Sequence, residues 1–102
     1  MSRPVEYPPP LPRGVKAIAL AIVADYPRRS RGDATRACLE LNRAVDDALM
    51  WVEECYRAPI LADIIARRGW ERSRARDTLY ERGYYARRNL VLRKVAEELD
   101  LI

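Results

Sequence analysis

The sequence predicts an all-α protein: a five-helix domain with a long central helix and a C-terminal helix-turn-helix. Apolar residues recur at steps of three and four along most of the chain, which is the period of one helix face. Prolines and glycines fall between these periodic segments, where helices begin and end. No segment alternates apolar and polar residues as a half-buried strand does. The length of 102 residues suits one domain with a modest core.

The N-terminal part of the chain predicts an arm followed by a first helix. Residues 1–12 form a proline-rich arm, because proline favours extended geometry and excludes helix. The first helix spans residues 13–26 and ends at Pro27. Leu20 and Ala21 make its outer face apolar too, so we expect the helix to be covered on both sides. Its inward stripe consists of Val15, Ile18, Ala19, Ile22, Val23 and Tyr26.

The longest predicted helix spans residues 33–57, with Asp33 as its N-cap. Along it, mostly small apolar residues repeat at alternating steps of four and three, which is a heptad seam. The seam consists of Ala34, Cys38, Leu41, Val45, Ala48, Val52 and Cys55. Packing of this seam on the first helix makes residues 13–57 the helical core, and a homodimer through helix 33–57 is the alternative.

Residues 58–102 predict a helix-turn-helix segment. A helix over 59–69 starts with proline as its first residue and stops at glycine. A shorter helix over 70–80, a glycine-containing tight turn at 81–83 and a longer helix over 84–100 follow. This order of elements is typical of a helix-turn-helix. The inward stripe of the last helix consists of Tyr84, Val91, Leu92, Val95 and Leu99.

Charge is segregated along the chain, although the net charge is only +4. Residues 33–63 carry seven acids and three arginines, whereas residues 67–94 carry ten bases and three acids, an excess of seven positive charges (10 − 3). Such an excess indicates a polyanion partner. Nearly all of these bases are arginine, which pairs with phosphate and guanine in a bidentate way. The alternative is a solvated basic face that only aids solubility.

The sequence lacks the residues that most catalytic and metal sites need. It contains no histidine, only two cysteines and no glycine-rich phosphate loop, so we expect no enzyme, no metal and no cofactor. The acid pairs Asp46–Asp47 and Glu53–Glu54 are interpreted as solvated helix surface. No apolar run reaches 18 residues and the N-terminus has no signal-peptide pattern, which favours a cytoplasmic chain with no membrane partner.

The last third of the chain resembles a known family. Residues 69–102, GWERSRARDTLYERGYYARRNLVLRKVAEELDLI, are similar to the C-terminal part of phage transcriptional regulators of the ArpU/RinA type. These regulators resemble in turn region 4 of bacterial sigma factors. The similarity rests on Trp70, on the pair Tyr84–Tyr85, on Arg87-Arg88-Asn89 and on the tail over residues 92–99.

The resemblance implies a regulator of late-gene transcription that binds double-stranded DNA, with RNA polymerase as a further possible partner. The recognition helix, about residues 82–99, would lie in the major groove. Arg82 and Tyr85 would face DNA first, and Arg88 and Asn89 would follow one turn later, while Arg87 would either join them or lie along the core. Phosphate contacts would come from the supporting helix, through Arg72, Arg74 and Arg76. The alternative function is a non-enzymatic oligomerisation or phage assembly and packaging protein.

Overall fold

The computed structural model describes residues 9–32 and 35–102, and in these residues it contains helices and no strand. The all-α prediction is confirmed. Five α-helices follow one another along the chain: α1 (Arg13–Ala24), α2 (Tyr26–Arg31), α3 (Arg36–Leu49), α4 (Glu54–Ile65) and α5 (Glu81–Glu98). Between α4 and α5 lie two 3-10 turns, η1 (Trp70–Arg72) and η2 (Arg74–Asp77). None of the helices in the described ranges is both long and apolar enough to cross a membrane.

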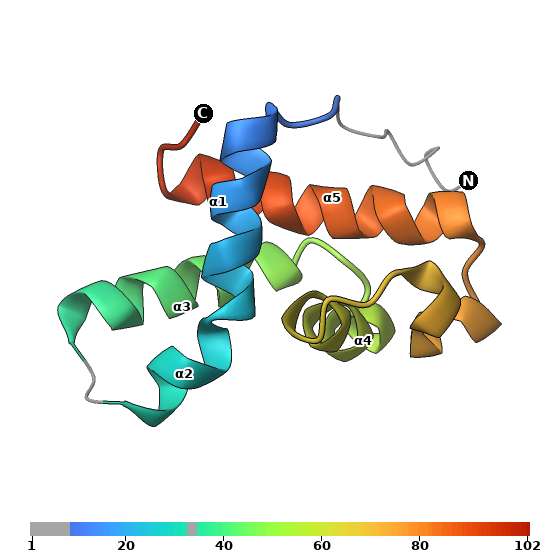
Figure 1. Ribbon diagram of the computed structural model, residues 1–102, viewed down its shortest axis with the longest axis horizontal. Coiled ribbons are helices and arrows are strands. Elements are labelled where there is room, and N and C mark those ends of the chain that lie inside the picture. The colour runs from blue at the N-terminus through green and yellow to red at the C-terminus, as the bar shows by residue number, and fades with distance from the viewer. Residues whose placement is uncertain (1–8, 33–34) are drawn as a thin grey trace.

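Helix α5 is the centre of the fold, and α1 lies across it (Figure 1). Of its predicted inward stripe, Tyr84, Val91, Leu92 and Val95 are fully buried and Leu99 is half-buried. These side chains meet residues from α1, α3 and α4 in one core. The partners are Ala19, Val23, Val45, Ala48, Ile60 and Ile64. Burial of this apolar surface is the main force that holds the helices together.

The predicted long helix over 33–57 is wrong, because the chain leaves the helix after Leu49. Residues 50–53 form a turn, and the Arg57 Nε–H donates to the carbonyls of Leu49 and Val52, both at 3.0 Å. The turn instead brings α4 back onto the core that α3 already contacts.

The seam predicted along residues 33–57 lies partly inside the chain's own core. Val45, Ala48 and Val52 are buried, whereas Cys55 is exposed. Helix α3 begins after Thr35, whose Oγ1 accepts a hydrogen bond from the Cys38 N–H at 3.2 Å. The predicted cap at Asp33 is therefore not the cap that the helix uses; Asp33 and Ala34 lie outside the described residues.

The segment after the first helix forms a second, short helix, and α1 is shorter than the predicted helix over 13–26. Helix α1 ends at Ala24, and Pro27 lies in the first turn of α2, where its missing N–H costs no hydrogen bond. Arg29 of α2 is buried, and its guanidinium donates to Asn42 Oδ1 at 2.6 Å and to the carbonyl of Ile22. These contacts fasten α2 to α3 and to the end of α1.

Helix α4 differs at both ends from the predicted helix over 59–69. It begins five residues before Pro59, which lies inside it, and it ends before Gly69. The left-handed conformation that ends the helix belongs to Arg67 (φ 56°). The Arg68 N–H donates to the Asp63 carbonyl at 2.8 Å and the Arg67 N–H to the Ile64 carbonyl at 3.2 Å. This is a Schellman motif with arginine where glycine is usual.

The predicted supporting helix over 70–80 and the tight turn at 81–83 are wrong. Residues 66–80, hereafter the connector, contain only the turns η1 and η2, and Ser73 Oγ accepts from the Ala75 N–H at 3.1 Å. The Trp70 indole donates to the Leu79 carbonyl at 2.8 Å and closes the connector on itself. Gly83 lies in the first turn of α5. Side chains hold the connector, so no glycine turn is needed.

The described end of the predicted arm, residues 9–12, rests on the helices. Arg93 Nη2 donates to the Pro9 carbonyl at 2.8 Å, and Leu11 packs against the core. Residues 1–8 of the predicted arm lie outside the described part of the chain.

Candidate nucleic-acid interface

The connector carries three of the six arginines of the predicted interface. Arg67, Arg72, Arg74 and Arg76 are all exposed, as is Arg82 just after the connector. Residues 66–82 hold six arginines and three acids, a local charge of +3 (6 − 3). This short segment therefore presents five exposed arginines beside one another in the sequence.

Several arginines on the helices pair with nearby acids, although Arg13 and Arg31 form no ion pair in the described residues. Arg28 pairs with Asp25, Arg36 with Glu40 at 3.2 Å, and Arg43 lies 3.9 Å from Asp47. In the same described residues, neither Arg72 nor Arg74 forms an ion pair. Their charge is therefore available to an anionic partner, whereas the charge of the helical arginines is partly satisfied.

Arg76 is held in place by an aromatic ring. Its guanidinium lies 4.9 Å from the centre of the Trp70 ring, and Nη1 donates to the Glu71 carbonyl at 3.2 Å. Stacking on tryptophan reduces the freedom of the long side chain before any partner binds. The connector thus presents one preoriented arginine beside two that extend into solvent.

The first turn of α5 is the part of that helix that solvent reaches most. Arg82 is exposed, and Tyr85 is partly exposed. The Tyr85 ring packs edge-on against Tyr84 with 5.0 Å between the centroids, and its Oη accepts from the Trp70 N–H at 3.3 Å. Tyr85 therefore braces the connector, and only one edge of it can meet a ligand.

The structure turns Arg87 and Arg88 toward the protein. Arg87 is 18% exposed, and its Nε donates to Glu53 Oε2 at 2.7 Å while its guanidinium covers the Tyr56 ring. Arg88 Nη1 donates to the Arg68 carbonyl at 2.6 Å and to Tyr84 Oη at 3.0 Å. Arg87 is therefore ion-paired inside the fold, and Arg88 is anchored there through Nη1.

Asn89 and the residues beyond it do not form an open face on α5. Asn89 is half-buried and lines a small cavity beside Pro9, Pro10 and Leu11. From residue 86 to residue 96 each position is buried or half-buried. On α5, the predicted DNA contacts are therefore exposed only near its start. The predicted site residues that are exposed are Arg72, Arg74, Arg76, Arg82 and Tyr85.

Tyr80 joins this surface, although the sequence analysis did not select it. It is the N-cap residue of α5, and its side chain is 89% exposed. An aromatic ring this exposed among arginines is suited to stacking on a nucleic-acid base. Its position just before the last helix was the available signal in the sequence.

A buried polar cluster lies directly beneath the connector. The Tyr84 hydroxyl donates to Asp63 Oδ2 at 2.9 Å and accepts from Arg88. Arg68 Nε lies 3.2 Å from Asp63 Oδ1 but without the geometry of a hydrogen bond, so this contact is mainly electrostatic. Burial is the main cause that raises the pKa of Tyr84; the hydrogen bond from Arg88 opposes the shift, and that to Asp63 adds to it.

The raised pKa of Tyr84 predicts a loss of stability in alkali. The unfolded state deprotonates its tyrosines above about pH 10 while Tyr84 stays neutral in the fold, so stability that is present below that pH is lost as pH rises. The slope reaches at most about 1.4 kcal/mol per pH unit for this group. Urea unfolding from about pH 9 to about pH 11 measures it.

Tyr84→Phe should flatten this alkaline dependence. Tyr80→Phe is the matched control, because the Tyr80 side chain is 89% exposed. If the free energy of unfolding of Tyr84→Phe falls with pH as steeply as that of the natural chain, other groups cause the alkaline loss of stability.

Within the described residues, no group of three or more carboxylates or cysteines is arranged to hold a metal ion. Comparison of the chain with protein-family models, with curated proteins and with solved structures finds no match.

Proposed function

We propose that this chain binds double-stranded DNA through the connector and the first turn of α5, and that it acts as a transcriptional regulator of phage type. The observation that carries the proposal is the group Arg72, Arg74, Arg76 and Arg82, exposed along one segment of the chain. Arginine at such positions makes bidentate contacts to phosphate oxygens. The regulatory role rests on the resemblance of residues 69–102.

The connector and α5 have different roles in this binding. Arg72, Arg74 and Arg76 contact phosphates and fix the position of the duplex. Arg82 and Tyr80, which flank the start of α5, are placed to meet base edges or stacked bases. Arg87, Arg88 and Asn89 support the fold behind this surface and do not contact DNA.

Salt dependence of duplex binding tests the proposal. Four to six phosphate contacts should give a slope of log affinity against log salt between about −3.5 and −5.5. Fluorescence anisotropy with a labelled duplex of random sequence, measured at several salt concentrations, gives this slope. A chain that binds no duplex at low salt would contradict the proposal.

The second candidate is a protein-interaction module, and one observation favours it. Met50 and Trp51, adjacent on the turn between α3 and α4, are 65% and 61% exposed. Large adjacent apolar side chains on a surface are typical of a protein contact, which could be a second copy of the chain or RNA polymerase. Self-association without duplex binding would favour this function over DNA binding.

A further inference from the structure

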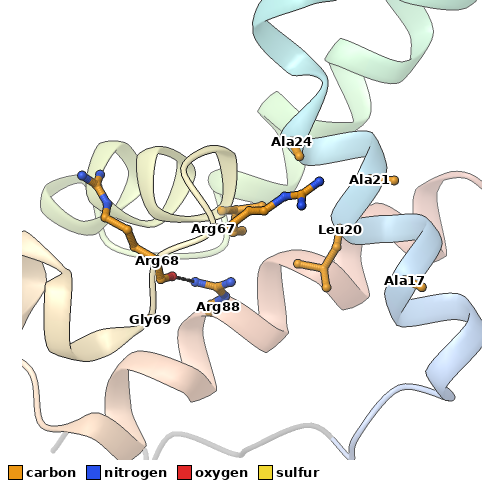
Figure 2. A pocket seen from close by; sticks show the side chains of 9 residues that line it. Ala17, Leu20, Ala21, Ala24, Arg67, Arg68, Gly69 and Arg88 are labelled. Atoms are coloured by element: carbon orange, nitrogen blue, oxygen red, sulfur yellow. Dashed lines mark hydrogen bonds between the residues drawn. The ribbon is translucent and has the colours of Figure 1, made fainter.

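A groove lies between α1, the end of α4 and α5, on a face that the sequence analysis expected to be covered. Figure 2 shows Ala17, Leu20, Ala21 and Ala24 of α1 along one wall, with Arg67 and Arg88 opposite. Its volume is about 480 Å³, and pockets for small molecules commonly measure roughly 300–1,000 Å³. The groove is therefore large enough for a small organic ligand.

The apolar wall is an uncovered face of a helix that is apolar nearly all round. Ala17 and Ala21 are exposed and Leu20 is half-buried, whereas Ala19 and Val23 on the other face are fully buried. No described residue covers this outer wall of the groove. A helix that is apolar on both faces is usually covered on both, so the sequence favours an apolar occupant here.

Two guanidinium groups define the charge of the groove. Arg88 donates two hydrogen bonds from Nη1, and they fix the side chain at the base of the groove. Arg67 has the left-handed backbone of the Schellman motif, and its side chain extends toward α1 (Figure 2). The Arg67 side chain is exposed and lies at the mouth of the groove.

We propose that this groove binds a monocarboxylic acid with an apolar body, such as a medium-chain fatty acid. Its carboxylate would pair with Arg67 and Arg88, and its hydrocarbon would lie on the alanines of α1. A second copy of α1 is a poor occupant, because Arg13 and Lys16 on that helix would add positive charge beside these arginines. The site does not depend on the proposed DNA binding, and its test uses no DNA.

Decanoate, kept below its micelle concentration, is the probe. Titration into the ¹⁵N-labelled protein should shift the amide signals of Ala17, Leu20, Ala21 and Ala24 in a saturable way. Octanoate should bind more weakly, by up to about fourfold for each missing methylene. Decanol should bind at least about tenfold more weakly than decanoate, because it has no carboxylate for the arginines.

Three variants distinguish loss of the binding site from loss of the fold. Arg67→Gly removes the guanidinium and keeps a residue suited to the left-handed backbone, so it should fold and bind decanoate roughly tenfold more weakly. Ala21→Phe should fill the groove and abolish binding. Ala37→Phe, on an exposed position of α3, is the matched control and should bind as the natural chain does.

Several results would overturn the site. These are shifts scattered over the molecule, equal affinity for decanol and decanoate, or unchanged affinity in Arg67→Gly. Binding to vesicles of anionic phospholipid with no binding of monomeric decanoate would assign the surface to a membrane and would equally reject the proposal.

Discussion

Asp63→Ala should lower the free energy of unfolding by about 3 kcal/mol, within a range of about 2–4 kcal/mol. Asp63 is 1% exposed and accepts the Tyr84 hydroxyl at 2.9 Å. Its removal leaves that hydroxyl without its acceptor in the core and leaves Arg68 without its counter-charge. Arg68 is 39% exposed on its side chain, so water screens part of that second effect. Urea denaturation followed by circular dichroism measures the change.

An exposed aspartate provides the control for this experiment. Asp47 lies 3.9 Å from Arg43 with both side chains largely exposed, so Asp47→Ala should change the free energy of unfolding by less than about 0.5 kcal/mol. Tyr84→Phe tests the same cluster from the other side, and it should cost about 1–3 kcal/mol because Asp63 loses its hydrogen-bond donor. If Asp63→Ala were as mild as Asp47→Ala, the cluster would not be a support of the connector.

The helical class and the inner face of α5 could be predicted because both depend on local periodicity. Tyr84, Val91, Leu92 and Val95 recur at helical spacing, and all four are fully buried. The break after Leu49 could not be predicted in this way, because the seam continues through Val52 without any local stop signal. The helix breaks because packing α4 on the common core lowers the free energy of the fold. The periodicity of the sequence contains no information on that contact.

The candidate site was harder to predict than the fold, since every candidate is an arginine or a neighbour of one. Arg74 and Arg87 look alike in sequence, but Arg87 meets Glu53, which is 34 residues away, whereas Arg74 forms no ion pair in the described chain. Only the folded chain decides which guanidinium groups are satisfied internally. The connector shows the same limit, because Trp70 and Ser73 stabilise 3-10 turns where composition favoured a helix.

Replacing Arg72, Arg74 and Arg76 together with glutamine should weaken duplex binding by about two to three orders of magnitude near 0.1 M salt. Each phosphate contact contributes about 0.9 to the salt slope, so the slope should fall by about 2.7 (3 × 0.9). The fold should persist, because all three side chains are exposed and each surface substitution typically changes stability by about 0.5 kcal/mol or less. Arg76 adds the loss of its stacking on Trp70, about 0.5–1 kcal/mol.

The decisive comparison is with a second triple variant of the same net charge. Replacing Arg13, Arg31 and Arg43 with glutamine also lowers the net charge from +4 to +1 (4 − 3), but these exposed residues lie on α1, α2 and α3. If the connector binds the duplex, the connector variant loses far more affinity than the helix variant and its salt slope falls further. Equal losses would mean that overall charge alone attracts DNA, and the connector would then have no special role. Because the two variants differ only in where the charge is removed, the comparison separates the effect of the arginines' position from the effect of net charge.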